Sequence, residues 1–504
     1  MFIDPVWQGS FCFDRGSRLV KIVRLMTVLM VFLAFNVFAK AADNAINSTL
    51  PIKAADCLIV DDAGNILMVH EVISGKYAIP GGAIIDDESP SMAAIREVYE
   101  ETGFHVSVGE MIARTYNSAI FACQINSPTP YFVDQTGKRV VMGWSAPHFG
   151  KEVKRVLLLP NTARVRNNYR FPEHKWRFPK WVPMVQASDF VLSPREDKAL
   201  TPFYRGQLHA LQTLHSASIS SRGYTYVSNT VIAFGGLFTP LFFVFSLAFI
   251  RAFHGHRALL IYGAGLLGVS VLSLLLSTAI ELPRPYFIDP VFGEQDTIGY
   301  TLPSMSLALT VFMFSWFVLC WDKEKQPKGR KRLALLGIVA VIVVSGKALL
   351  QGEHFPSDLV IGALMGVGAS FALRWVKDLR FSNRNRMLTS ARFWLLAFVF
   401  NAVIGLWIHK PQIIYLSAIC LGTYCSLLCL KLYPIYVSAV RRPAKVTFFA
   451  LATGGILLLV TGNLYVTGKY AINQIVVAMN CGTAWAIAVL LLVVTPRVFL
   501  RLMR

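Results

Sequence analysis

The second half of the chain alternates long apolar runs with short polar loops. Nine such runs follow residue 228, and most approach the length that an α-helix needs to cross a bilayer. They cover residues 229–250, 258–280, 303–321, 333–350, 358–376, 393–408, 412–430, 446–466 and 471–495. The pattern predicts an all-α polytopic membrane domain of about nine helices. We divide it into residues 216–380 and four further transmembrane helices in residues 381–504.

Residues 42–215 have shorter runs and predict a soluble α+β domain. Residues 54–60 and 66–72 are candidate strands around a turn at residues 62–65, and residues 120–125 form another candidate strand. A helix is expected between Ser89, which can cap its start, and Gly103, which suits a left-handed end. Pro90 suits the first turn of this helix.

Residues 1–41 have the parts of an export signal. Basic residues precede an apolar core at residues 25–38, and residues 39–41, Ala-Lys-Ala, offer a small-x-small cleavage site. The core has 14 residues, which is short for a spanning helix, so we favour cleavage over an uncleaved anchor. Both alternatives place the following domain outside the cytoplasm.

Composition and charge fit a membrane protein with one defined orientation. Of the 504 residues, 54% are hydrophobic and 15% are charged, and the formal net charge is +20. If the soluble domain lies outside, the inner loops carry 20 Lys and Arg residues and the outer loops carry three. The positive charge therefore predicts topology, and no nucleic-acid partner is expected. We expect a multi-pass protein of a bacterial inner membrane with its soluble domain in the periplasm.

One helix is predicted to present three carboxylates together. Glu97, Glu100 and Glu101 have the spacing i, i+3 and i+4, so they share one face. The opposite side carries Ala94, Ile95 and Val98, which we expect to pack on a sheet. Carboxylates on a rigid helix, with the Gly82 loop close by, suit Mg²⁺ or Mn²⁺. A solvated acidic helix face is the alternative.

The full spacing around this helix resembles the signature of the Nudix hydrolases. The matching positions are Gly82, Glu88, Arg96, Glu97, Glu100, Glu101 and Gly103. The resemblance implies a Nudix-type α/β/α sandwich and hydrolysis of a phosphoanhydride by a metal-activated water. It also implies that Glu97, Glu100 and Glu101 hold Mg²⁺ or Mn²⁺, with Glu100 as one candidate base. Arg96 would orient the glutamates, and the Gly82 backbone would help to bind substrate.

A basic and aromatic segment at residues 164–181 allows three interpretations. It could bind an anionic substrate with aromatic stacking, or rest on anionic lipid headgroups. It could equally be a solvated loop with one core strand.

Three segments on the expected outer face carry a second pattern. Residues 282–285 are Leu-Pro-Arg-Pro, residues 302–306 are Leu-Pro-Ser-Met-Ser, and residues 351–358 are Gln-Gly-Glu-His-Phe-Pro-Ser-Asp. Their order and spacing resemble the type-two phosphatidate phosphatase superfamily of membrane lipid phosphatases. The resemblance implies that His354 attacks phosphorus and that Asp358 orients it. Arg284 and Ser304 would bind the phosphate.

Three positions depart from that superfamily. Its first lysine falls on Ser277, its general-acid histidine on Ser306, and a phosphate-binding arginine on Ala348. Lys347, next to the last of these, is a candidate replacement cation. We therefore expect a domain that recognises an anionic lipid headgroup and turns over poorly. A plain loop histidine at position 354 is the alternative.

The remaining cysteines and asparagines suggest packing roles. Cys57 and Cys123 could pair if their domain is extracytoplasmic, which the sequence leaves open. The other candidates lie in apolar runs: Cys320, Cys420, Cys425, Cys429 and Cys481 as packing residues, and Asn401, Asn463, Asn473 and Asn480 as interhelical hydrogen-bonding residues.

Three functions follow from these patterns. The leading hypothesis is a membrane-tethered Nudix-type hydrolase acting on a nucleoside diphosphate derivative or a lipid-linked diphosphate. The second is a lipid phosphate or diphosphate phosphatase that uses His354. The third is a non-enzymatic lipid-binding or transport module.

Overall fold

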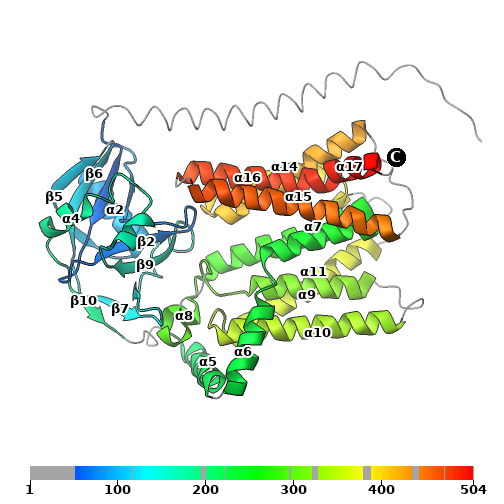
Figure 1. The fold of residues 1–504 in the computed structure, drawn as a ribbon, viewed down its shortest axis with the longest axis horizontal. Coiled ribbons are helices and arrows are strands. Elements are labelled where there is room, and N and C mark those ends of the chain that lie inside the picture. The colour runs from blue at the N-terminus through cyan, green and yellow to red at the C-terminus, as the bar shows by residue number, and fades with distance from the viewer. Residues whose placement is uncertain are drawn as a thin grey trace, which may run out of the picture.

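The structure is a computed structural model of the chain. It describes residues 51–115, 117–193, 200–220, 222–293, 297–320, 327–378, 387–433, 442–469 and 472–502. The predicted export signal at residues 1–41 lies outside the described residues. Figure 1 shows a strand-rich domain at one end of a helical bundle.

The N-terminal domain contains two β-sheets. One has the strand order β4-β1-β6-β5, and the other has the order β10-β7-β8-β9-β2-β3. The strands are β1 (Ala54–Leu58), β2 (Ile66–Glu71), β3 (Tyr77–Ala78), β4 (Gly81–Ala83), β5 (Val106–Thr115), β6 (Ser118–Ile125), β7 (Thr129–Val133), β8 (Arg139–Val141), β9 (Val153–Leu159) and β10 (Phe190–Leu192). All three strand predictions are confirmed, with ends that differ by up to two residues.

Helix α2 (Pro90–Thr102) covers one face of the sheets. Ser89 caps it by accepting a hydrogen bond from the Met92 N–H, and Gly103 ends it with a φ of 78°. Ala94 and Val98 are fully buried in the core against the sheets. The prediction that Ile95 packs there is wrong: its side chain is 38% exposed, because the buried stripe passes through Ala93 instead.

The basic and aromatic segment covers the opposite face. It forms α3 (Ala163–Asn167), α4 (Phe178–Trp181) and the 3₁₀ turn η1 (Val182–Met184), with one isolated β-bridge at Tyr169. Tyr169, Phe178 and Trp181 are buried in a second core cluster. These three aromatic residues pack in the core, whereas Trp176 is 72% exposed, and the segment forms short helices in place of the core strand of the third interpretation.

A disulfide links the centre of the first sheet. Cys57 on β1 and Cys123 on β6 are bonded, and both are buried. Because β1 and β6 are parallel neighbours, the bond ties two strands that are distant in sequence. The pairing that the sequence left open is present in the fold.

The C-terminal region is helical. Its elements are α5 (Pro202–Ile219), α6 (Arg222–Gly235), α7 (Pro240–Ile280), α8 (Pro285–Ile288), η3 (Pro290–Phe292), α9 (Met305–Cys320), α10 (Pro327–Leu350), α11 (Pro356–Asp378), α13 (Ala391–Trp407), α14 (Pro411–Leu432), α15 (Arg442–Lys469), α16 (Asn473–Val489), η4 (Leu490–Val494) and α17 (Thr495–Leu502). Among the described residues, six helices are long and apolar enough to cross a membrane.

The predicted count of nine spanning helices is not confirmed. α9 and α13 are apolar but shorter than the six, and the predicted run at residues 229–250 is interrupted. α6 ends at Gly235 and α7 begins at Pro240, since glycine and proline favour a break there. Within α7, Gly255 has a φ of 87° and marks a kink between two helical parts.

The last helices are joined by polar side chains. The Asn463 amide donates to the Asn480 carbonyl oxygen at 2.7 Å, and the Asn480 amide donates to the Tyr415 hydroxyl at 3.2 Å. These bonds connect α15, α16 and α14. The Asn401 amide also donates to Cys420 Sγ at 3.9 Å between α13 and α14, so three of the four asparagines form the predicted interhelical bonds.

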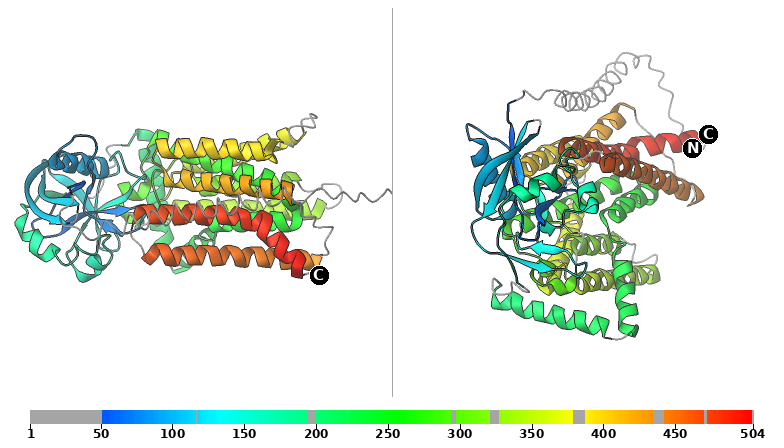
Figure 2. Two further views of the ribbon diagram at one scale, coloured as in Figure 1. Left: turned by 90° about the horizontal axis from the view of Figure 1, so that it is seen from above. Right: turned by 60° about the vertical axis from the view of Figure 1, so that its left-hand side comes forward.

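The N-terminal domain is docked on the loops at one end of the bundle. Both views in Figure 2 show it against that end. Phe149 packs against Phe287 and Tyr300, with ring centroids 5.1 and 5.3 Å apart. The Arg155 guanidinium lies 5.4 Å from the Tyr286 ring centroid, and Gln135 donates to the Val291 carbonyl. The two domains therefore share a packed interface.

Candidate functional site

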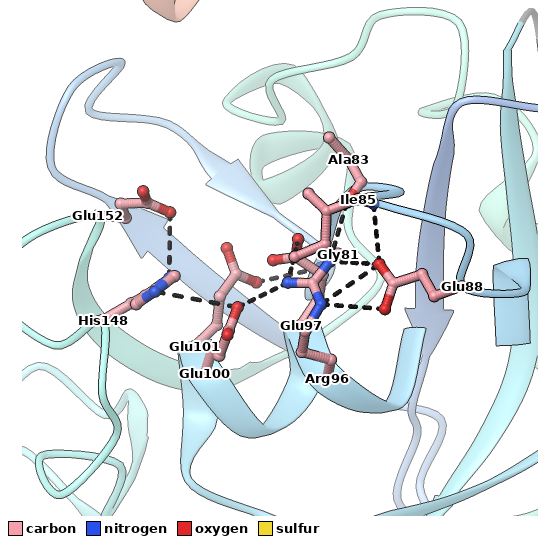
Figure 3. A network of polar contacts seen from close by, with 10 residues as sticks. All are labelled: Gly81, Ala83, Ile85, Glu88, Arg96, Glu97, Glu100, Glu101, His148 and Glu152. Atoms are coloured by element: carbon pink, nitrogen blue, oxygen red, sulfur yellow. Dashed lines mark hydrogen bonds and ion pairs between the residues drawn. The ribbon is translucent and has the colours of Figure 1, made fainter. Parts of the chain in front are cut away.

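Arg96 is the centre of the polar network on α2. Its guanidinium contacts Glu97 at 2.9 Å, Glu100 at 2.7 Å and Glu88 at 2.8 Å. It also donates to the Ala83 carbonyl at 2.9 Å, so the helix is joined to the end of β4. Figure 3 shows these groups converging from the helix and the loop. The structure thus brings together the residues that the sequence spacing selected.

Two glutamates of this network are buried. Glu97 and Glu101 are 8% and 6% exposed. Burial raises the pKa of Glu101 well above its ordinary value, and the nearby Glu97 charge raises it further. The Gly81 N–H donates to Glu101 at 3.0 Å. A Cβ atom at Gly82 would lie 2.4 Å from Glu97 Oε1, so this glycine lets the loop approach the carboxylate.

His148 and Glu152 extend the site, although the sequence did not single them out. His148 Nε2 lies 3.9 Å from Glu100, and its Nδ1 lies 3.3 Å from Glu152. The His148 backbone N–H also donates to the Glu100 carbonyl. The neighbouring Glu152 carboxylate raises the pKa of His148. Both residues come from the loop before β9, where no local motif points to them.

Arg170, from the basic and aromatic segment at residues 164–181, lies near these carboxylates. Arg170 forms an ion pair with buried Glu71, and its guanidinium lies 4.8 Å from the Phe171 ring centroid. Arg170 also contributes charge to the surroundings of Asp56 and Glu152. The substrate-binding interpretation of this segment stays a prediction.

The carboxylate site has the donor chemistry of a divalent-cation site. Within the described residues, no three acidic, histidine or cysteine side chains already converge as a complete ligand group. Glu97 and Glu100 instead share the Arg96 guanidinium, and Glu101 is buried close to Glu97. Buried oxygen donors with raised pKa values are stabilised by added positive charge. These residues therefore fit Mg²⁺ or Mn²⁺.

A second polar cluster surrounds His354 at the end of the bundle facing the docked domain. His354 and Asp358 are buried, and Thr301 lies between them. The Thr301 hydroxyl donates to Asp358 at 2.5 Å, and the His354 Nδ1–H donates to the Thr301 carbonyl at 2.7 Å. In the described part of the chain no hydrogen bond joins Asp358 directly to His354, so the expected pairing runs through Thr301.

The Arg284 guanidinium lies next to Nε2, the second ring nitrogen of His354. Its Nη1 lies 3.3 Å from His354 Nε2, and burial lowers the pKa of His354 well below its ordinary value. The same guanidinium donates to the carbonyls of Gly299, Ile298 and Glu353. The predicted nucleophile is thus a buried ring whose Nε2 faces an arginine.

The other predicted phosphate-binding residues lie near this centre. Lys347 forms an ion pair with Glu353 at 2.5 Å, so its charge is already balanced. Ser304 is fully buried, and among the residues that the structure describes its hydroxyl has no hydrogen-bond partner. The Ser304 backbone N–H donates to the Asp358 carbonyl. Ser304 therefore holds an unused polar group beside the His354 cluster.

Two family models match the chain, one over the region that contains the α2 glutamates and one over the region that contains His354. Residues 50–203 match the model of the NUDIX domain, and residues 258–382 match the model of the PAP2 superfamily. The chain carries a NUDIX domain followed by a PAP2 superfamily domain. The suspected fusion of these two families is confirmed.

Individual relatives match the first domain. A MutT-like protein from Streptomyces ambofaciens is 27% identical over 96 residues, which are 18% of this chain and 60% of the relative. A NUDIX hydrolase structure from Nitrosomonas europaea is 16% identical, with a TM-score of 0.20, over 29% of this chain and 81% of that chain. A UDP-X diphosphatase structure is 19% identical, with a TM-score of 0.18, over 36% of this chain and 90% of that chain.

Proposed function

We propose that the NUDIX domain hydrolyses a phosphoanhydride with the help of Mg²⁺ or Mn²⁺. Glu97, Glu100 and Glu101 would hold the cation. The observation that carries this proposal is the pair of buried carboxylates, Glu97 and Glu101, on the same helix face as Glu100. A bound divalent cation supplies positive charge to the diphosphate and lowers the pKa of water.

The protein groups have separable tasks in this proposal. Arg96 holds Glu97 and Glu100 in position through hydrogen bonds of 2.9 and 2.7 Å. Glu100 is a candidate base, and His148 beside it can accept or share a proton. The Gly82 backbone, which lies against the Glu97 carboxylate, would help to complete the site. Arg170 brings positive charge that would attract an anionic substrate.

The NUDIX domain is proposed to lie in the periplasm of a bacterial inner-membrane protein. The excess of basic residues in the expected inner loops supports this orientation. The Cys57–Cys123 disulfide supports it too, because such bonds persist in oxidising compartments. The substrate would be a nucleoside diphosphate derivative or a lipid-linked diphosphate that is accessible from that side.

The test compares the full chain in detergent micelles with its Glu101→Gln variant. Release of phosphate products from a panel of nucleoside diphosphate sugars, dinucleoside polyphosphates and prenyl diphosphates is measured with and without Mg²⁺. We expect Mg²⁺-dependent turnover of at least one compound and a large loss in Glu101→Gln. Glu110→Gln, an exposed glutamate on β5, is the matched control and should retain activity. Equal turnover by Glu101→Gln and the parent would contradict the assignment.

A second function is proposed for the PAP2 domain: it binds an anionic lipid phosphate and turns it over slowly. The buried Ser304 hydroxyl without a partner favours a ligand there. Ser306 and Ala348 stand where the superfamily has an acid and a cation, and Arg284 faces His354 Nε2. Loss of a general acid typically lowers the rate by ~10²–10⁴.

This second proposal is tested on phosphatidate without Mg²⁺. We compare the parent, His354→Ala, and the double variant Ser306→His with Ala348→Arg. Slow or no release by the parent and a gain in the double variant are expected. Fast release that disappears in His354→Ala would instead make this domain the principal enzyme.

A further inference from the structure

One turn of the NUDIX domain contacts both the carboxylate site and the membrane domain. It comprises residues 146–152, just before β9, and carries His148 and Glu152. The His148 backbone N–H donates to the Glu100 carbonyl at 2.8 Å, and His148 Nε2 lies 3.9 Å from the Glu100 carboxylate. Figure 3 shows His148 and Glu152 beside the glutamates of α2. This turn therefore forms one side of the proposed site.

Phe149, the residue after His148, packs outside the core of the NUDIX domain. Its side chain is 2% exposed, yet among the described residues it belongs to neither of the two clusters that form that core. It is buried in a third cluster with Phe287, Tyr300 and other apolar residues of α5 and of the PAP2 loops. Its ring centroid lies 5.1 Å from that of Phe287 and 5.3 Å from that of Tyr300. The membrane domain therefore supplies the aromatic neighbours of this side chain.

Gly150, the next residue of the turn, also contacts the helical region. A Cβ atom at Gly150 would lie 2.6 Å from the Gly299 Cα atom, so the two backbones are in close contact. Lys410 Nζ donates to the Gly150 carbonyl at 3.0 Å. Two consecutive residues of the turn thus dock on the helical region, whereas His148 just before them faces Glu100.

Backbone hydrogen bonds hold the turn in one conformation between these two sets of contacts. The His148 carbonyl accepts hydrogen bonds from the N–H groups of residues 151–153, at 3.0 to 3.2 Å. The Phe149 N–H donates to the Ala146 carbonyl at 3.0 Å. Because these bonds fix the backbone on both sides of Phe149, a shift of this residue in the interface displaces His148 as well.

We infer that Phe149 is a positioning residue of the NUDIX site, and that Phe287 and Tyr300 of the PAP2 domain hold it in place. His148 lies against Glu100 only while the NUDIX domain is docked on the membrane domain. The membrane domain thus completes the hydrolytic site, whatever ligand it binds itself. This role rests on the proposed phosphoanhydride hydrolysis, whereas the placement of the turn can be measured without turnover.

The test compares the full chain in detergent micelles with Phe287→Ala and Tyr300→Ala, which remove the two rings that contact Phe149. Phe287→Leu and Tyr300→Phe are the conservative variants. Tyr204→Ala is the matched control, since the Tyr204 ring packs on Phe355 of the same cluster, with ring centroids 5.1 Å apart.

Two quantities are measured for each protein. The first is kcat for Mg²⁺-dependent hydrolysis of nucleoside diphosphate sugars, dinucleoside polyphosphates and prenyl diphosphates. The second is amide hydrogen exchange, followed by mass spectrometry, in the turn at residues 146–152 and in β1. Exchange in the turn reports whether the His148 N–H keeps its bond to the Glu100 carbonyl, and exchange in β1 reports whether the NUDIX fold is intact.

We expect Phe287→Ala and Tyr300→Ala to lower kcat about tenfold or more, because the rate falls steeply when a catalytic group is displaced. Exchange should become faster in the turn and stay at the parental rate in β1. The conservative variants and Tyr204→Ala should keep the parental kcat and the parental exchange.

Parental kcat in both alanine variants overturns the inference, and so does parental exchange in the turn. An equal loss of kcat in Tyr204→Ala, or faster exchange in β1 of both alanine variants, also overturns it, because the effect would then be on the fold as a whole. If the parent hydrolyses none of the compounds but the turn exchanges faster in the alanine variants, the proposed hydrolysis fails and the placement of His148 by the PAP2 domain stands.

Discussion

Replacing Gly82 with alanine is expected to disable the NUDIX site without unfolding the domain. The new Cβ atom would lie 2.4 Å from Glu97 Oε1, whereas real Cβ contacts essentially never fall below 3.0 Å. The carboxylate must therefore move by at least about 0.6 Å, and it is held by a 2.9 Å bond to Arg96. A displacement near 1 Å in a catalytic group can lower the rate by ~10²-fold. We expect a loss of this order in kcat/KM.

The measurement is Mg²⁺-dependent turnover of whichever phosphoanhydride the parent hydrolyses, together with thermal unfolding. Gly206→Ala is the matched control, because a Cβ atom there meets nothing within 4 Å. Gly206 lies in α5, where alanine is favoured over glycine by about 0.5–1 kcal/mol, so this variant should keep full activity and stability. Parental kcat/KM in Gly82→Ala would refute the argument that Glu97 must stay where it is.

Two further predictions concern acid stability and orientation. Burial lowers the pKa of His174 to about 4 from an ordinary 6.5, so the unfolded chain binds a proton in this interval that the fold excludes. Protonation of His174 in the unfolded chain therefore lowers the free energy of unfolding by about 3 kcal/mol at most. This loss is absent above pH 6.5 and grows as the pH falls to 4. Unfolding midpoints should show this loss in the parent and less of it in His174→Gln; equal slopes would contradict it. The orientation is tested with a reporter enzyme that is active only in the periplasm. Fused after residue 215 it should be active, and fused at Arg504 it should be inactive. An inactive fusion after residue 215 would contradict the proposed periplasmic placement.

The parts of the site that could be predicted depend on local signals. Ser89, Pro90 and Gly103 define the ends of α2 through their own backbone preferences, so the helix and its glutamates follow from one short segment. Ile95 was placed wrongly because helical periodicity gives the buried face only to within one position. The predicted apolar run at residues 229–250 failed for a related reason, since hydrophobicity alone did not register the break before Pro240.

The rest depends on contacts between distant segments. His148 reaches Glu100 from a loop about fifty residues further along the chain, and its sequence surroundings contain no motif. Thr301 enters between His354 and Asp358 only because the segment before α9 meets the start of α11 at that end of the bundle. Lys410 approaches Gly150 across 260 residues, and a single lysine in a short loop gives no sign of this in the sequence.

The docked interface makes the position of the NUDIX glutamates a fixed property of the molecule. Its contacts come from a turn at Gln135, a loop at Phe149 and Gly150, and a strand at Arg155, so they restrain rotation as well as translation. A domain on a flexible linker could reach substrates at many heights above a bilayer. A domain held in this way keeps its glutamates at one height above the bilayer. A lipid-anchored diphosphate would reach them only when the segment between its lipid and its diphosphate matches that height, whereas a freely diffusing substrate meets no such selection.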